Sequence, residues 1–336
     1  MAHPFAKLDR DAQCPYTRAM SSPLLFIIAC LIWGSTFWAI TLQLGDVAPA
    51  VSVVYRFGLA CATLFAWCAL RGDTLRLPWR AQKWMLLQGL ASFALSYVCT
   101  YSSEQYLVSA LVSVLFALMV FWTPLLNRIA FGTRLTWSTC CAAFVAICGI
   151  VLLFYQSIGA ALHDIVGGGN GRNAHFLLGF MLALAATVSS TLGNALVMKV
   201  REHSSNVMLS MAWSMLWGTL MVAVWAIATG QSWQVPTRPS YWIGLLYLAI
   251  FGSVIAFSAY FTLIARIGTQ KTVYIGVVTP VISVLLSVQF EHYRPAAIEW
   301  VGMLLCLSSV AWALTSGARK TAGVSAISTT SSVKAT

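Results

Sequence analysis

Long apolar runs recur along almost the whole chain, and they limit its fold more than any other feature. The run VSVVYRFGLACATLFAW at 51–67 contains a single charged residue. A bilayer core about 30 Å thick takes about 20 apolar helical residues, and backbone inside lipid must satisfy its own hydrogen bonds. Only 9% of the residues are charged, against about a quarter in a typical soluble domain. We therefore expect an all-α polytopic membrane protein.

Ten of these runs are long enough to predict transmembrane helices, mostly joined by short loops. We expect the helices at 22–43, 49–70, 83–103, 106–127, 135–155, 175–198, 207–229, 241–264, 272–290 and 297–315.

The longest connection divides the chain into two halves. Residues 156–174 are glycine-rich and follow the fifth expected helix, so they predict a linker between a first five-helix unit at 22–155 and a second at 175–315. The remaining residues form two tails, 1–21 and 316–336, and the second is rich in Ser, Thr and Ala, which indicates disorder.

The basic residues predict the orientation of the helices. With ten helices and a cytoplasmic N-terminus, 16 of the 20 Lys and Arg residues fall in cytoplasmic segments and three in external ones. Such a bias towards the cytoplasm is the usual topology signal of a multi-pass protein. It places both termini in the cytoplasm and explains the net charge of +11 without nucleic acid, which would need the basic residues gathered into a patch.

An odd number of helices per half means that two similar halves must lie upside down relative to each other, as in inverted-repeat transporters. FWTPLL at 121–126 and VVTPVI at 277–282 occupy matching places in the two halves. Their prolines, Pro124 and Pro280, are predicted helix kinks, although a Thr-Pro pair can also be simply tolerated in a membrane helix.

Enzyme chemistry has little support in the sequence. The histidines lie in tails, loops or helix ends, and the chain has no H-E-x-x-H, G-x-S-x-G or Walker A motif. The cysteines form no C-x-x-C pair or metal spacing. We expect no catalytic residues, no cofactor and no metal.

Several short stretches resemble the EamA family of the drug/metabolite transporter superfamily. They are IWGSTFWAI at 32–40, the triplet at 55–57, the two Thr-Pro pairs, and FEHYRPAAIEWVG at 290–302. The resemblance implies ten helices in two inverted five-helix repeats and export of amino acids, other small metabolites or drugs across the bacterial inner membrane. Members often have Gly-Glu after helix 4, where this chain has FGTRL at 131–135.

Arg56 is the sharpest candidate for a functional residue. It lies seven residues into its helix, about 10 Å deep at 1.5 Å per residue, where a charge usually faces the bundle interior with a partner. We expect it to bind a substrate carboxylate in the cavity or to close an external gate against Glu104 or Glu291. The alternative is that Arg56 snorkels outward or ties its helix to neighbouring carbonyls.

Helix 3 carries a polar-aromatic face of Tyr97, Tyr101 and Glu104, at helical spacing. The tyrosines are cavity candidates, or else residues of an interfacial belt, and Glu104 is a candidate for proton coupling. In helix 6, Ser190 and Asn194 are either ligand contacts or hydrogen-bonding links between helices.

The remaining cavity candidates are Trp33, Ser35 and Thr36 in helix 1 and Tyr260 in helix 8. Together with the resemblance to the EamA family, these residues indicate an inner-membrane secondary transporter that exports amino acids or similar small metabolites by alternating access. The alternatives are a multidrug or cation efflux transporter and a non-transporting membrane partner protein. One monomer could contain the whole pathway, and a homodimer is an alternative.

Overall fold

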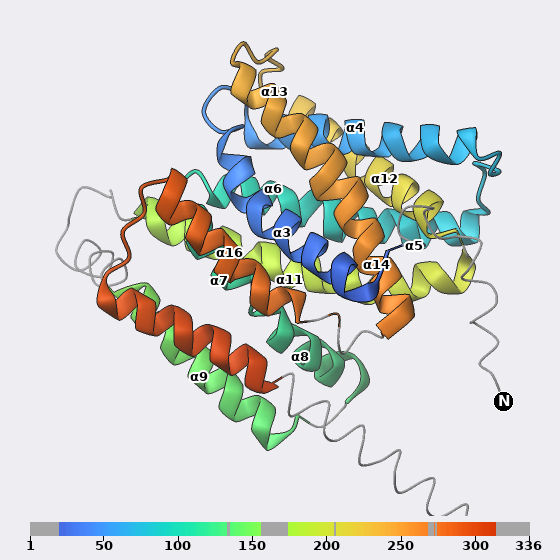
Figure 1. The fold of residues 1–336 in the computed structure, drawn as a ribbon. Helices are drawn as coiled ribbons and strands as arrows, with labels where there is room; N and C mark the ends of the chain where they lie inside the picture. Colours follow the sequence, from blue (N-terminus) through green and yellow to red (C-terminus); the bar gives the residue numbers. More distant parts are fainter. Residues whose placement is uncertain are drawn as a thin grey trace, which may run out of the picture.

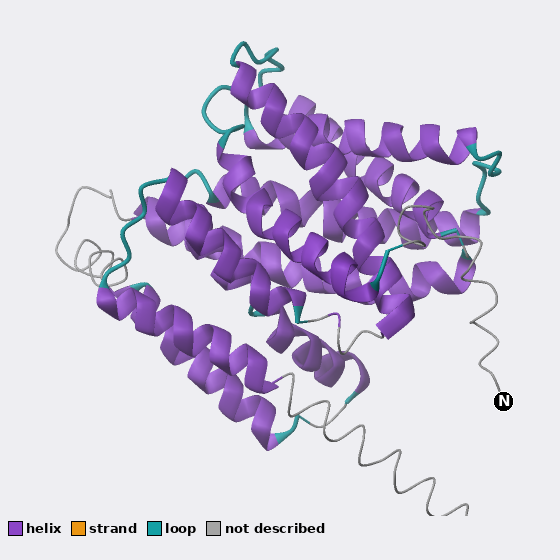
Figure 2. Ribbon diagram, in the orientation of Figure 1, coloured by secondary structure: helices purple, strands orange, loops and turns teal. Residues whose placement is uncertain are grey.

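A computed structural model describes residues 20–132, 135–155, 174–204, 206–267, 272 and 274–313. This part of the chain is helical and contains no strand (Figure 2). The predicted linker at 156–174 lies outside it except for Ala174, as do the predicted tails except for residues 20 and 21. The all-α prediction is confirmed for the described residues.

Within the described residues, the first half of the chain forms eight helical segments. They are α3 (Ser22–Thr41), α4 (Pro49–Leu70), α5 (Trp79–Gln88), the π-helical segment η1 (Gly89–Leu95), α6 (Ser96–Ser103), α7 (Ser109–Phe116), α8 (Met119–Phe131) and α9 (Trp137–Leu153). The segments α5, η1 and α6 follow one another without a gap and make one long helix.

The second half of the chain is also a series of helices. Its segments are α11 (Ala174–His203), α12 (Val207–Ala228), α13 (Pro239–Leu246), the π-helical segment η2 (Tyr247–Ile255), α14 (Ala256–Ile267), α16 (Ile275–Phe290) and a final helix, Ala297–Ala313. Here α13, η2 and α14 form the continuous long helix.

Local sequence explains where several of these helices begin and end. Pro49 begins α4 at a position where its missing N–H is not needed. The Asn206 side chain caps α12 by accepting a hydrogen bond from the Leu209 N–H at 3.1 Å. Gly132 ends α8 with φ 66°, a left-handed conformation that favours glycine.

Helix boundaries differ from the predicted ones where the apolar pattern stops before the helix does. The third predicted helix starts at Trp79 rather than at 83, directly after Pro78. The helix α11 runs to His203 rather than to 198 because its polar end, with a Lys199–Glu202 ion pair at 3.0 Å, continues beyond the apolar run.

Six described stretches are long and apolar enough to cross a membrane, as expected of a polytopic membrane protein. They are Ser22–Thr41, Pro49–Leu70, Ser109–Leu126, His175–His203, Val207–Ala228 and Pro239–Tyr260. Three shorter apolar helices accompany them: Trp137–Leu153, Ile275–Phe290 and Ala297–Ala313.

Helices from the two halves of the chain pack against one another throughout the bundle (Figure 1). The helix α4 packs on α12, α3 packs on α16 and α14, and α11 packs on α5, η1 and α6. The helix α9 lies beside the final helix, where the backbones approach so closely that a Cβ on Gly149 would lie 2.8 Å from the Gly302 oxygen. Small residues at such crossings are typical of packing between membrane helices.

The two π-helical segments occupy corresponding places in their long helices and contact opposite halves of the chain. A carbonyl of η1, that of Ala91, accepts a hydrogen bond from the Ser189 hydroxyl of α11 at 2.8 Å. A carbonyl of η2, that of Gly252, accepts one from the Trp33 indole N–H of α3 at 3.3 Å. Each half therefore presents its π-helical segment to the first helix of the other half.

Among the described residues, four connections lie at the end of the bundle where α4 begins, close to Arg56. They are residues 42–48, 104–108, 229–238 and 291–296, and we call this the Arg56 end. It is the end that holds the buried polar side chains of interest for function.

Candidate functional site

Arg56 lies in α4, seven residues from its first residue, and is 1% exposed. Its Nε donates to the Ser253 hydroxyl of η2 at 3.2 Å, and its Nη1 donates to the Tyr101 hydroxyl of α6 at 3.4 Å. The guanidinium carbon lies 4.7 Å from the centre of the Tyr97 ring and 5.3 Å from that of Phe57. The side chain therefore faces the bundle interior and does not snorkel outward.

The two hydroxyls that accept hydrogen bonds from Arg56 also donate hydrogen bonds of their own. Tyr101 is fully buried and donates at 2.7 Å to Oε1 of Gln43, which lies two residues beyond the end of α3. Ser253 donates to the carbonyl of Leu248 at 2.9 Å, a partner five residues earlier that the wide turn of a π-helix brings within reach. Three helices, α3, α4 and α6, thus meet η2 in one buried polar cluster.

Gly252 lies at the centre of this cluster, next to Ser253. A Cβ there would be 2.8 Å from Cγ2 of Thr36 and 3.3 Å from Nη2 of Arg56. The Gly252 carbonyl accepts the bond from Trp33 described above. Only glycine lets η2 come so close to α3 and α4, so the predicted cavity residues Trp33, Thr36 and Arg56 are brought together around it.

Two more of the predicted cavity residues lie on the same interface between α3 and the second half. The Ser35 hydroxyl is 2.6 Å from the Tyr247 hydroxyl of η2. Trp33 packs with its ring centre 5.0 Å from that of Tyr260 and 5.2 Å from that of Phe257. Aromatic walls with a few hydroxyls are typical of small-molecule sites.

Glu104 follows the last residue of α6, at the Arg56 end. Its side chain is buried, and neither carboxylate oxygen has a hydrogen-bond partner within the described part of the chain. Burial raises the pKa of the Glu104 carboxyl well above its usual range. The negative charge of Glu291 raises that pKa further, whereas the positive charge of Arg56 lowers it.

Glu291 follows α16 and has well-defined partners. Its carboxylate accepts hydrogen bonds from the Ser109 backbone N–H at 3.2 Å, from the Ser109 hydroxyl, and from the Ser287 hydroxyl at 3.0 Å. Ser109 is the first residue of α7, so Glu291 satisfies the free N–H end of that helix and joins α7 to α16.

The gate between Arg56 and an acid stays a prediction, because the described residues do not form it as an ion pair in this structure. Among the described residues Arg56 makes no ion pair with Glu104 or Glu291, and its donors are bonded to the hydroxyls of Ser253 and Tyr101 instead. The rings of Tyr97 and Phe57 also lie over the guanidinium, where they stabilise a cation without an acid.

In α11, the two predicted polar residues differ in their surroundings. The Ser190 hydroxyl is 2.6 Å from that of Ser96, which donates in turn to the Ala186 carbonyl at 3.1 Å. Ser190 is therefore a link between α11 and α6, which was one of its two predicted roles. Asn194 lies one turn further and is exposed, away from the Arg56 cluster.

Both prolines lie inside helices, Pro124 in α8 and Pro280 in α16. The chain interrupts its regular α-helix upstream of Pro124, between α7 and α8. There the N–H groups of Ala117 and Leu118 donate to the carbonyls of Val114 and Leu115, three residues back, at 3.1 and 3.0 Å. Such a tight turn interrupts the regular bonding of the helix, and the kinks at Pro124 and Pro280 stay predictions.

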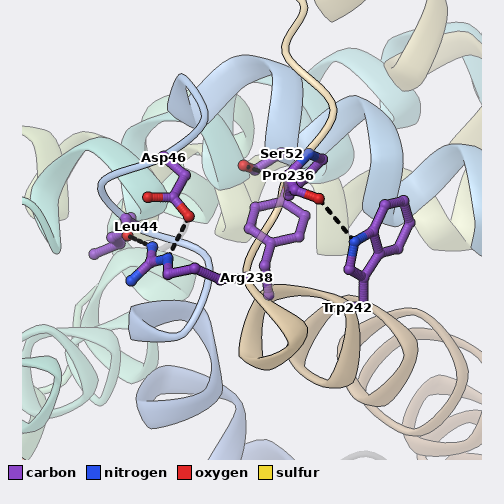
Figure 3. Close-up of polar contacts among 7 residues, drawn as sticks. Leu44, Asp46, Ser52, Pro236, Arg238 and Trp242 are labelled. Atoms are coloured by element: carbon purple, nitrogen blue, oxygen red, sulfur yellow. Dashed lines mark hydrogen bonds and ion pairs between the residues drawn. The ribbon is translucent and has the colours of Figure 1, made fainter.

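Two connections are tied together at the surface of the Arg56 end (Figure 3). Arg238 forms an ion pair with Asp46 and donates through Nη2 to the Leu44 carbonyl at 2.7 Å. Below them the hydroxyls of Ser52 and Tyr241 are 2.8 Å apart. The 42–48 connection of the first half is thus joined to the 229–238 connection of the second.

Sequence reasoning missed several members of the cluster. Gln43 and Ser253 are single polar residues within or beside apolar helices, and that isolation is the signal that could have drawn attention to them. Gly252 and Tyr247 carry no such signal, because their importance depends on how closely η2 approaches α3.

The sequence profile of the EamA-like transporter family matches residues 20–155 and again residues 177–315. The chain belongs to the EamA-like transporter family. Family members are transporters and not enzymes, so the prediction that this chain is not an enzyme is confirmed.

Relatives of this EamA-like chain include named transporters. A probable amino-acid metabolite efflux pump of Escherichia coli (strain K12) is 23% identical over 85% of this chain and 92% of its own length. The uncharacterized inner membrane transporter YedA of the same strain is 25% identical over 81% of this chain and 84% of its own.

A solved crystal structure has the same fold as this EamA-like chain. It aligns with a TM-score of 0.61 at 20% sequence identity and covers 89% of this chain and 98% of its own. The resemblance inferred from the sequence motifs is therefore confirmed at the level of the family.

Proposed function

We propose that this EamA-like protein is a secondary transporter of the bacterial inner membrane that exports amino acids or similar small metabolites by alternating access. Membership of the family supports transport of a small molecule. The names of the relatives described above support amino-acid metabolites as the substrate class and the inner membrane as the location.

The observation that carries the proposal is the buried cluster around Arg56. It is built from α3, α4 and α6 of the first half and η2 of the second, so it spans the interface that alternating access would open and close. A guanidinium suits a carboxylate, which it binds with two parallel hydrogen bonds. The neutral hydroxyls that hold Arg56 now are weaker acceptors, which a substrate carboxylate would replace.

The same proposal includes ten transmembrane helices in two inverted repeats, 22–155 and 175–315, joined by the linker at 156–174. The two matches of the family profile and the corresponding places of η1 and η2 support this arrangement. The bias of basic residues supports a cytoplasmic location of the tails 1–21 and 316–336, which would put the Arg56 end outside. A monomer would contain the full pathway.

The test is release of preloaded substrates from proteoliposomes that contain the purified protein. Labelled amino acids and drug-like cations are loaded separately, and release is compared between the wild type and Arg56→Met. Release of amino acids that is lost in Arg56→Met supports the proposal. Release of cations alone would favour drug efflux, and failure of every substrate to leave would favour a non-transporting membrane partner.

A further inference from the structure

Glu104 and Glu291 lie at the same end of the bundle in opposite environments. Glu291 receives hydrogen bonds from three donors, one N–H and two hydroxyls, which stabilise its negative charge. Glu104 is 6% exposed, and its two oxygens are buried with no donor among the described residues. Burying an ionised carboxylate in that way costs several kcal/mol, and the cost falls away when the group is neutral.

The charged and titratable groups around Glu104 compensate its charge only in part, through the positive charge of Arg56. From α4, Arg56 is bonded to Ser253 and Tyr101 and makes no ion pair with Glu104. From α16, Glu291 contributes a second negative charge. On α6, the Tyr101 hydroxyl donates its hydrogen bond to Gln43.

The helix α11 adds no cation that would hold the Glu104 carboxylate directly. Its His175 is exposed and stacks on Tyr106, with ring centres 5.6 Å apart. The hydroxyl of Tyr241, in α13, is hydrogen-bonded to that of Ser52. A neutral Glu104 is therefore the form that this arrangement accommodates.

We propose that Glu104 is a proton-binding site of the Arg56 end, protonated while this end is closed as it is here and ionised when the end opens to water. The step is the formation of one O–H bond between a carboxylate oxygen and a proton from water, and it reverses on opening. The claim that Glu104 couples proton binding to transport rests on the proposed function. The claim that Glu104 binds a proton does not.

Opening would change the protonation of Glu104 because it would restore water to the carboxyl. A hydrated glutamate has a pKa of about 4.3 and is ionised near pH 7. The closed form binds the proton more tightly, so lowering the pH favours closure. Between the open and closed pKa values, the closed-to-open ratio changes up to tenfold per pH unit.

A second side chain beside Tyr101, that of Gln43, has a buried atom with no hydrogen-bond partner among the described residues. Oε1 of Gln43 accepts a hydrogen bond from the Tyr101 hydroxyl, but Nε2 of Gln43 is buried with no acceptor among the described residues. Buried polar atoms are rarely left unpaired in a resting structure. Two side chains with such atoms, Glu104 and Gln43, indicate a region that meets water or a ligand in another state of the protein.

The test is infrared spectroscopy of the full-length protein in proteoliposomes, because a protonated carboxyl has a carbonyl band that a carboxylate lacks. We expect that band at pH 7.5 in the wild type and its loss in Glu104→Gln. The control Glu291→Gln removes an acid held by three donors and should leave the band. A pH titration of the wild type, which needs no variant, should remove the band only in alkaline solution.

A wild-type spectrum without the band at pH 7.5 would overturn the proposal, and so would a band that persists in Glu104→Gln. The spectrum is independent of transport, so a protein that shows the band but releases no substrate contradicts the proposed function alone. Where release does occur, Glu104→Gln should flatten its dependence on pH, and release with unchanged pH dependence would contradict the coupling role.

Discussion

Arg56→Met separates the role of Arg56 in transport from its role in stability. Methionine is unbranched and apolar and can fill much of the space of the arginine stem. The variant is measured in two ways, by thermal unfolding in detergent and by release of preloaded amino acids from proteoliposomes. The structure predicts a small effect on the first and a large effect on the second.

The interactions that Arg56 would lose can be added up from the structure. Hydrogen bonds to charged groups contribute about 1.5–3 kcal/mol each, and the distances of 3.2 and 3.4 Å to Ser253 and Tyr101 place these two at the weak end. The contacts with the aromatic rings add about 0.5–2 kcal/mol. The loss is thus roughly 4 kcal/mol by these ranges.

Replacing Arg56 with methionine also removes the free-energy cost of burying a charge. Keeping a guanidinium out of water costs several kcal/mol per ion. Neither hydroxyl partner is left unpaired, because Ser253 still donates to Leu248 and Tyr101 still donates to Gln43. The terms nearly cancel, so we expect the free energy of unfolding of Arg56→Met to stay within about 2 kcal/mol of the wild type.

Release of amino acids should fall at least tenfold, since a charged hydrogen bond to the substrate is worth about 1.5–3 kcal/mol and every 1.4 kcal/mol is a factor of ten. Leu64→Ala, at a fully buried site on the same helix, shows that the unfolding assay is sensitive, because it should cost about 2–5 kcal/mol. A loss in Arg56→Met as large as in Leu64→Ala, or undiminished release, would refute the reasoning.

Three other changes test the packing. Gly89→Ala places a Cβ 2.4 Å from the carbonyl oxygen of Ser214 in α12 and should lower the free energy of unfolding by about 1–3 kcal/mol. The control Gly58→Ala has its nearest atom at 3.9 Å and should be neutral or stabilising in the same thermal unfolding assay. Glu291→Gln weakens the cap of α7 and should lower the unfolding temperature, with a loss of about 1–3 kcal/mol; an unchanged temperature would show that the cap is not needed. Arg238→Ala removes a half-exposed ion pair with Asp46, so its effect should be below about 1 kcal/mol and vanish in high salt, and a large salt-independent loss would contradict that.

The sequence was most informative where one residue stands out from its surroundings. Arg56 is charged within an apolar run, and its inward direction was one of the two possibilities that the cost of a charge in lipid left open. Ser190 was expected either as a helix link or as a ligand contact, and its bond to Ser96 is the first of these. The ranges of the helices followed from the apolar pattern to within a few residues.

What could not be predicted depends on contacts between distant segments. The expected partners of Arg56 were a substrate carboxylate, an acid of the protein or neighbouring carbonyls. Instead, the close approach of η2 at Gly252 brings the Ser253 hydroxyl to it. The link between Asp46 and Arg238 joins two polar loops whose distance no periodic pattern fixes. The π-helical segments have no apolar signature of their own, since their side chains continue the run of the helices around them.

Because of the π-helical segments, the number of residues in each long helix decides which side chains reach the Arg56 cluster. An α-helix turns about 100° per residue, so deleting one residue from η1 would rotate α6 by about that angle relative to α5. Tyr101 would then leave Arg56, and Glu104 would leave the buried corner it occupies beyond α6. Single-residue insertions and deletions in 89–95 or 247–255 should therefore be far less tolerated than most substitutions there, because they change the face that every later residue of the helix presents.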